Sequence, residues 1–203
     1  MDHIKTLTLV GGISRDSINK KLFNAIREMD LPAFEFDTYD ISRLPFFSQD
    51  LELDPPDNVT EYKEKIRDCE ALLIVTPEYN RSFPGVLKNA IDWGSRPYGQ
   101  NLWDKKPAAV MGASIGNIGT FGAQHHMRQV MAYLNLHVMG QPEFYFNGSK
   151  SFDEQGRLTN DKTRELLTKF FEAFEEHIAL VTGQEKVNRS FQSRGLEDSP
   201  MPH

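Results

Sequence analysis

The 203-residue sequence predicts an α/β fold in which helices cover both faces of a five-stranded parallel sheet, giving three layers. Short β-branched or apolar segments alternate along the chain with segments whose apolar residues recur at helical spacing. One segment, Ala71–Val75, is continuously apolar, which is typical of a parallel strand buried on both faces. Strict alternation of strand and helix implies a parallel sheet with helices on both faces, because right-handed crossovers place successive helices on a face set by the strand order.

The first part of the chain predicts two strands, a helix and a long loop. Residues 4–10 form a β-branched apolar run that stops at two glycines, and apolar residues at helical spacing follow over 18–29. Residues 33–39 alternate phenylalanine with polar neighbours, which indicates a partly buried strand at a sheet edge. Residues 40–58 contain three prolines and predict a long loop, which in compact domains is often functional.

The middle of the chain repeats the strand and helix pattern. Apolar residues over 59–69 predict a second helix, which leads into the strand 71–75. A third helix is expected from about Pro84, because proline suits a first helical turn. A fourth strand is expected over 108–113.

The last part supplies a helix, a strand and a longer helix. Apolar residues over 127–134 follow helical spacing, and a fifth strand is expected within 138–146. The fifth helix begins near residue 160 or 161 and continues to 181. We therefore expect one domain over residues 1–182, followed by a polar C-terminal tail over 183–203.

Composition narrows the class of function. The formal net charge is −6 and no block of lysine and arginine occurs, so we expect no nucleic-acid partner. No segment approaches the about 20 apolar residues that a membrane helix needs, so we expect no insertion into a membrane. The lone Cys69 is interpreted as a buried apolar residue rather than a redox group. The N-terminus does not resemble a signal peptide, and a cytoplasmic location is expected.

Three loops follow the first, third and fourth strands, and their ends meet at one edge of a parallel sheet, where ligands bind in such folds. The first is GGISRDSIN, residues 11–19, which leads into a helix N-terminus that attracts phosphate. Ser14, Ser17 and Asn19 offer donors and Arg15 offers charge. The alternative is that Ser17 or Asp16 only caps the helix.

The second loop, TPEYNRSFPG over residues 76–85, combines aromatic, amide and proline residues. Such a stiff polar loop suits a planar heterocycle that needs a flat contact and hydrogen bonds at its edge. Tyr79 either stacks on the ligand or fills a gap between loops, and Glu78 is either a general acid or structural. The third loop, ASIGNIGTFG over 113–122, has three glycines that permit close backbone approach to a ligand.

These motifs resemble the NADPH-dependent FMN reductase family over about residues 4–181. The most specific stretch, residues 76–96, is similar to the family signature PEYN-x-S-x-PG-x-LKNAIDW-x-SR at every specified position. The first loop departs from the family's GS-x-R-x-x-S-x-N, because Gly12 and Ser14 stand at the usual serine and arginine positions and Arg15 follows one place later.

The resemblance implies a flavodoxin-like fold with strand order 2-1-3-4-5, a homodimer or homotetramer, and non-covalent FMN. It implies that the phosphate is held by Ser14, Arg15, Ser17 and Asn19, and the ring by Pro77, Glu78, Tyr79, Asn80 and Ser82, with Ser114 and Gly116 beside the flavin at its other edge. NAD(P)H would reduce the flavin, and a small-molecule acceptor such as a quinone, azo compound, free flavin or metal ion would then take the electrons. No protein side chain is assigned as catalytic, because the cofactor carries the chemistry.

Two other functions are open at this point. A flavodoxin-like electron carrier or flavin-binding regulatory protein would bind FMN without oxidising NAD(P)H. A phospho-receiver domain would need acidic residues after the first strand, where this chain has glycines. His125 and His126 are adjacent and diverge on a helix, so they are interpreted as surface or interface residues rather than metal ligands.

Overall fold

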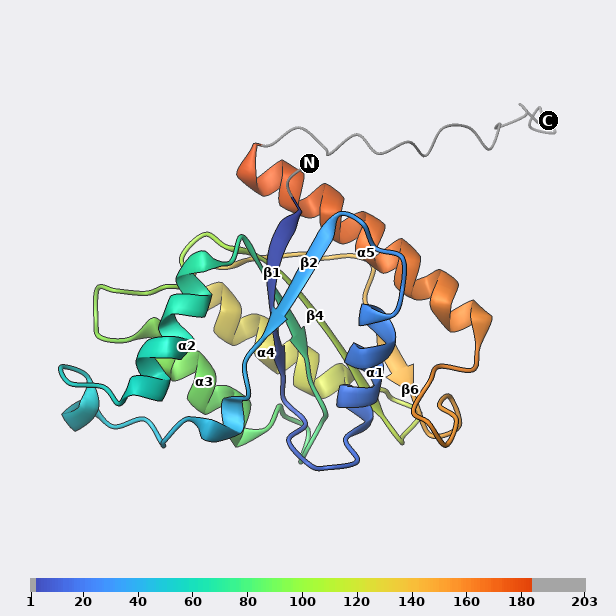
Figure 1. Ribbon diagram of the computed structural model, residues 1–203, viewed down its shortest axis with the longest axis horizontal. Coiled ribbons are helices and arrows are strands. Elements are labelled where there is room, and N and C mark those ends of the chain that lie inside the picture. The colour runs from blue at the N-terminus through green and yellow to red at the C-terminus, as the bar shows by residue number, and fades with distance from the viewer. Residues whose placement is uncertain (1–2, 184–203) are drawn as a thin grey trace.

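The computed structural model describes residues 3–183, and Figure 1 shows a central sheet between two layers of helices. The strands are β1 (Ile4–Val10), β2 (Phe34–Thr38), β3 (Ala71–Val75), β4 (Pro107–Ser114), β5 (His137–Val138) and β6 (Tyr145–Asn147). The α-helices are α1 (Ile18–Arg27), α2 (Asp57–Asp68), α3 (Gly85–Ser95), α4 (Phe121–Tyr133) and α5 (Asp161–Thr182). Two short 3-10 helices, η1 (Ile41–Arg43) and η2 (Gln49–Leu51), lie in the predicted long loop. Of the predicted tail 183–203, all but Gly183 lies outside the described residues.

All strand pairs are parallel and the order is β2-β1-β3-β4-β5, which confirms the predicted flavodoxin-like topology. The predicted fifth strand is two short strands in the structure. β5 pairs with the start of β4, and β6 pairs with its end. The interruption over 139–144 contains Gly140 and Pro142. Proline has no N–H for a ladder, so the chain leaves the sheet and returns to it.

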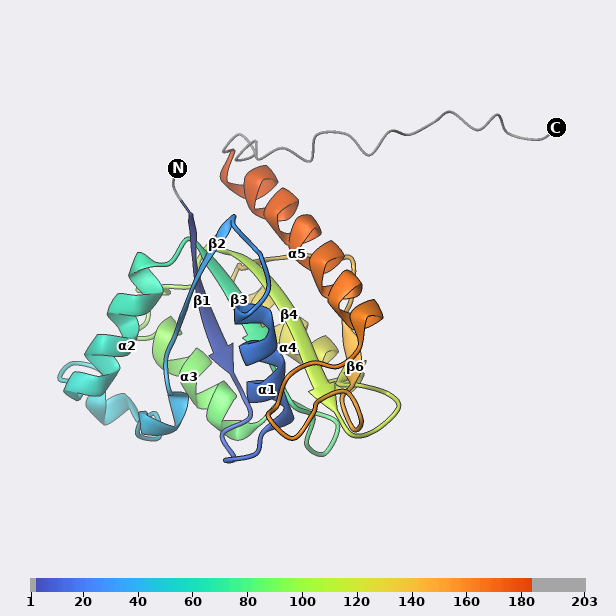
Figure 2. The same ribbon diagram turned by 45° about the vertical axis from the view of Figure 1, so that its right-hand side comes forward.

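Alternate side chains of the strands build two cores on opposite faces of the sheet. In β3, Leu72 and Ile74 face the cluster formed with α2, α3 and α4. Leu73 and Val75 face the cluster formed with α1 and α5. Figure 2 shows these two helix layers on either side of the sheet. A fully buried β3 is the physical basis of the continuous apolar segment in the sequence.

The edge strand β2 is only partly buried, as predicted. Phe34 is buried, and the last residues of the strand are exposed. Its ring packs at 5.3 Å from Phe171 and 5.8 Å from Phe174 of α5, so the aromatic stripe of α5 covers this edge. No helix within residues 3–183 is long and apolar enough to cross a membrane.

The carboxyl ends of β1, β3 and β4 point to the same edge of the sheet, the lower edge in Figures 1 and 2. The loops at this edge span residues 11–17, 76–84 and 115–120. The parallel topology therefore brings together the three segments that the sequence singled out.

Candidate functional site

The first loop presents backbone N–H groups around the N-terminus of α1. Ser17 caps the helix, and its Oγ accepts from the backbone N–H of Lys20 at 3.4 Å. Within residues 3–183 the backbone N–H groups of residues 12–16 have no hydrogen-bond acceptor. Ser14 and Arg15 are exposed on this loop. Unpaired N–H groups at a helix N-terminus form an anion-binding site.

Lys20 adds a positive charge that the sequence reasoning did not single out. Its Nζ donates to the carbonyl of Ile13 at 3.0 Å, so the ammonium group lies over the loop. The signal in the sequence is its position in the first turn of α1, one residue after the loop motif.

Gly12, which stands where the related family usually has serine, is explained by packing. A Cβ at residue 12 would lie 2.1 Å from Ser17 Oγ. With Ser17 turned to cap α1, a side chain at residue 12 would require Ser17 to move.

Asn19 lies beneath the loops rather than on their surface. Its Nδ2 donates to the Ala113 carbonyl and its Oδ1 accepts from the Ala113 N–H, both at 2.9 Å. The residue is fully buried. The amide therefore joins the start of α1 to the end of β4 and fixes where the third loop begins.

The second loop is a tight two-residue hairpin. Tyr79 and Ser82 exchange both backbone hydrogen bonds, at 2.8 and 3.0 Å. Asn80 and Arg81 between them have φ values of 51° and 66°, as in the type I′ turn. Pro77 is buried at the base of the loop, whereas the Tyr79 side chain is 55% exposed at its tip. The hairpin fixes the backbone from which the exposed Tyr79 side chain projects.

Glu78 ties the second loop to the third. Its Oε2 accepts from the backbone N–H of Ala123 in the first turn of α4 at 3.1 Å. Its Oε1 lies 3.5 Å from the Arg81 guanidinium, and the side chain is 11% exposed. A carboxylate at a helix N-terminus is stabilised by the helix dipole, which favours the structural reading of Glu78 over a general acid.

The third loop begins where β4 ends, and its first residues lie close to the second loop. Ser114 Oγ accepts from the Gly116 N–H at 3.2 Å and donates to the Gly116 carbonyl at 3.1 Å. At the end of β4, a Cβ on Gly112 would lie 2.1 Å from the carbonyl oxygen of Thr76. The absence of a side chain there lets the two loops start side by side.

Apolar side chains gather on the three loops although they face solvent. Five large hydrophobic residues are between 47% and 79% exposed there: Ile13, Tyr79, Ile115, Ile118 and Phe121. The N–H groups of Glu78, Asn80 and Arg81 have no acceptor among the described residues. Exposed apolar groups beside unpaired donors are typical of a site for a flat, partly polar ligand.

Two histidines of α4, which the sequence predicts to be surface or interface residues, make contacts near the loops. His126 Nδ1 is 2.8 Å from Ser82 Oγ. His125 Nε2 is 3.1 Å from Tyr145 Oη. Burial and a hydrogen bond to Glu143 raise the pKa of Tyr145, so its hydroxyl stays protonated at neutral pH. No group of three potential metal-ligating side chains occurs within residues 3–183.

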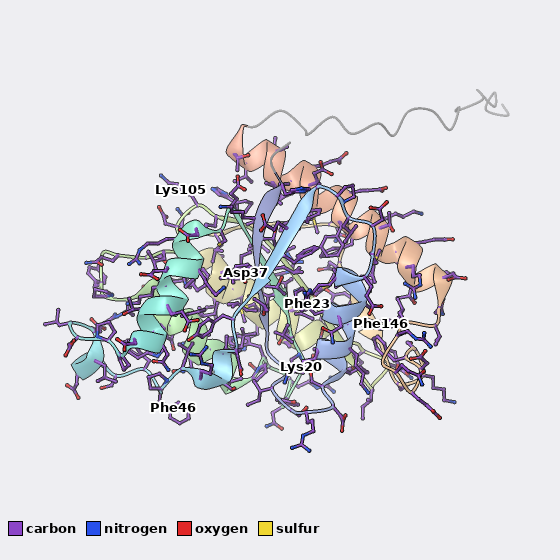
Figure 3. The ribbon with its side chains drawn as sticks, viewed as in Figure 1. Lys20, Phe23, Asp37, Phe46, Lys105 and Phe146 are labelled. Atoms are coloured by element: carbon purple, nitrogen blue, oxygen red, sulfur yellow. The ribbon has the colours of Figure 1, made fainter. Side chains whose placement is uncertain are left out.

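The long loop before α2 is fastened by the family-like signature of α3. Asn89 accepts from the Phe47 N–H at 2.8 Å and donates to the Pro45 carbonyl at 2.9 Å. Trp93 Nε1 donates to the same carbonyl at 2.8 Å. Phe46 between these anchors is 87% exposed, and Figure 3 shows it projecting away from the ribbon.

The remaining polar pair of the signature lies on the surface of α3, where Lys88 and Asp92 form an ion pair at 2.7 Å. Asn89 and Trp93 therefore position a loop, and Lys88 and Asp92 face a groove between α3 and α4.

Comparison with known proteins finds FMN reductases and quinone reductases as relatives. A model of the NADPH-dependent FMN reductase family matches residues 4–151. A 2-hydroxy-1,4-benzoquinone reductase from a Burkholderia species is 46% identical over 172 residues, covering 84% of this chain and 94% of its own. A quinone reductase from Pseudomonas putida is 43% identical, covering 85% and 93%.

A solved structure has a similar overall fold. The flavoenzyme NAD(P)H:(acceptor) oxidoreductase FerB from Paracoccus denitrificans superposes with a TM-score of 0.82 at 38% identity, covering 87% of this chain and 97% of its own.

Proposed function

Because the chain belongs to the NADPH-dependent FMN reductase family, we propose that its three loops hold FMN and that the enzyme reduces a quinone with NAD(P)H. The observation that carries the proposal is the meeting of an anion-binding helix terminus with exposed apolar residues at one edge of the sheet.

The first loop would bind the phosphate. The unpaired N–H groups of residues 12–16, the hydroxyls of Ser14 and Ser17, and the charges of Arg15 and Lys20 suit a dianion. In this proposal Asn19 does not contact the phosphate but supports the site indirectly, because its amide is hydrogen-bonded to Ala113.

The second and third loops would hold the ring. Pro77, Tyr79 and Ser82 supply the apolar face and hydroxyl, and the N–H groups of Glu78 and Asn80 lie beside them. Ser114 and Gly116 border the opposite side, with their mutual hydrogen bonds fixing the loop shape. Glu78 keeps the two loops at a constant separation through its bond to α4.

Bound FMN supplies hydride and electron transfer between reduced nicotinamide and the acceptor. The protein supplies position and electrostatics. Backbone N–H groups fixed by the type I′ hairpin stabilise negative charge that develops beside them, because they need no reorganisation. The exposed rims, including Ile115 and Phe121, leave space for a flat acceptor.

A quinone is the favoured acceptor because two relatives that cover most of the chain carry that activity in their names. Azo compounds, free flavin and metal ions are the other acceptors that an exposed site could serve. We place the reaction in the cytoplasm, which the lone buried thiol and absence of a possible intramolecular disulfide support.

We also propose that the enzyme self-associates through the groove between α3 and α4. The groove has a volume of about 540 Å³ and includes Phe47, Val130 and Leu134 among its lining. Tyr133 on its rim is 88% exposed. His126 lines the groove and also contacts Ser82, so a second copy there would adjoin the second loop.

Steady-state kinetics test the proposed reaction. The FMN-loaded enzyme should oxidise NADPH or NADH in the presence of 1,4-benzoquinone, and a parallel screen with an azo dye, FMN and ferric citrate ranks the acceptors. An FMN-loaded protein that oxidises neither nicotinamide with any acceptor would instead be an electron carrier. That result would contradict the proposed activity.

A further inference from the structure

A second cavity lies away from the three loops, between α2 and the segments that flank η2 and α3. Its volume is about 270 Å³. Lys63 and Arg67 of α2 line it, together with the apolar residues Leu53, Pro55 and Pro97. The cavity is therefore separate from the carboxyl edge of the sheet that holds the candidate flavin site.

Lys63 is a buried charge without a counter-ion in contact. The residue is 6% exposed, yet within residues 3–183 no acceptor lies within hydrogen-bond distance of its Nζ. The ammonium group lies 5.7 Å from the centre of the Trp93 ring, with which it makes a cation–π contact. Lysine is rarely buried in this way unless it is paired, which makes the group unusual.

The charges around Lys63 do not cancel. Arg67 lines the same cavity, and its side chain has no hydrogen bond or ion pair among the described residues. The carboxylate of Glu52 also lines the cavity, but it is engaged by Arg96, which donates to its Oε1 from Nε at 2.7 Å and from a terminal nitrogen at 2.5 Å. Lys63 and Arg67 therefore share this cavity, and neither makes a direct ion pair with a described residue.

The electrostatic environment of Lys63 would be improved by a bound anion. Burial and the charge of Arg67 lower the pKa of Lys63, whereas the charge of Glu52 raises it. An anion between the two cations would reverse both effects, because it would compensate the buried charge and screen the repulsion.

We propose that this cavity binds a phosphate group, with Lys63 and Arg67 as its cationic partners. Thr60 and Gln100, which also line the cavity, add a hydroxyl and an amide as donors. The apolar walls favour a phosphate monoester, whose organic part packs on Pro55 and Pro97, over free phosphate. The site is independent of the proposed flavin site.

Isothermal titration of the FMN-loaded protein tests the proposal, because FMN occupies the first loop and removes it as a competing site. Inorganic phosphate and phenyl phosphate are titrated separately. We expect one site, with phenyl phosphate the tighter ligand. Lys63→Met keeps an unbranched side chain of similar size without the charge and should weaken binding about tenfold, as the loss of one charged hydrogen bond predicts.

Two further variants keep the test decisive. Arg67→Gln changes an exposed side chain, so it should fold normally and weaken binding severalfold. Lys65→Met removes a charge from the same helix, but Lys65 pairs with Asp37 outside this cavity and should leave binding unchanged. Absence of binding to the wild type would overturn the proposal. Equal weakening by Lys65→Met, or no weakening by the other two, would also overturn it.

Discussion

Asn19 shows what a single residue can and cannot reveal in the sequence. Its type and its place at a helix start fit a phosphate donor, as the family resemblance implies. Its partner, Ala113, is 94 residues away, and only the folded chain turns the amide toward β4. The contacts of His126 with Ser82 and of Glu78 with Ala123 are equally non-local. The sequence therefore predicts which residues stand in the loops, whereas their contacts with distant residues appear only in the folded chain.

The account predicts that Asn19→Ala lowers the free energy of unfolding by about 2–4 kcal/mol, because two buried backbone groups of Ala113 lose their partners. Chemical denaturation measures the change. Asn24→Ala on the exposed face of the same helix is the control and should change stability by less than about 0.5 kcal/mol. Equal effects of the two substitutions would refute the role given to Asn19.

Cys69 should be chemically silent in the folded protein. It is buried, and burial raises the pKa of its thiol. Below that raised pKa the thiol is protonated, so at neutral pH little nucleophilic thiolate forms. A thiol reagent should react slowly with the native protein and rapidly in denaturant, with NADPH oxidation unchanged after native treatment. Fast modification with loss of activity would show a redox role instead.

Helices and strands could be predicted from the sequence where local residue patterns alone determine their ends. The strands 4–10 and 71–75 agree with the structure because their buried apolar runs end at polar or glycine residues. The fifth strand was harder, since Gly140 and Pro142 divide it into two short pairings with β4. The fastening of loop 40–56 by Asn89 and Trp93 depends on contacts more than 40 residues apart, which no local pattern contains.

The close approach of β3 and β4 at their carboxyl ends depends on Gly112. Gly112→Ala would place a Cβ 2.1 Å from the Thr76 carbonyl and 2.3 Å from Thr120 Oγ1, and would push the second and third loops apart. We expect a lower melting temperature and at least tenfold weaker FMN binding by fluorescence titration. Gly140→Ala, which meets no atom within 4 Å, should behave as wild type. Unchanged FMN affinity in Gly112→Ala would contradict this geometry.

The whole molecule assembles its site from segments that are distant in sequence. Residues 11–17, 76–84 and 115–120 meet because β1, β3 and β4 are parallel neighbours in the sheet, so their carboxyl ends lie at the same edge. This could be predicted from alternation alone. Quaternary structure could not, because it depends on surface complementarity rather than on periodicity.

Self-association through the groove between α3 and α4 predicts a particle larger than a monomer in light scattering. Tyr133→Asp places a charge on the rim of the groove and should shift the population toward monomer. Tyr98→Asp is matched, because Tyr98 is 90% exposed and does not line the groove. A monomeric wild type, or the same shift in both variants, would refute this interface.

The central claim is that the three loops bind FMN through its phosphate and its ring together. An equilibrium titration of the flavin-free protein with FMN and with riboflavin tests it most directly, since the two ligands differ only in the phosphate. We predict one FMN per chain and riboflavin binding at least tenfold weaker, because several charge-assisted hydrogen bonds at the first loop are lost. Equal affinity for the two flavins, or no binding of FMN, would contradict the account.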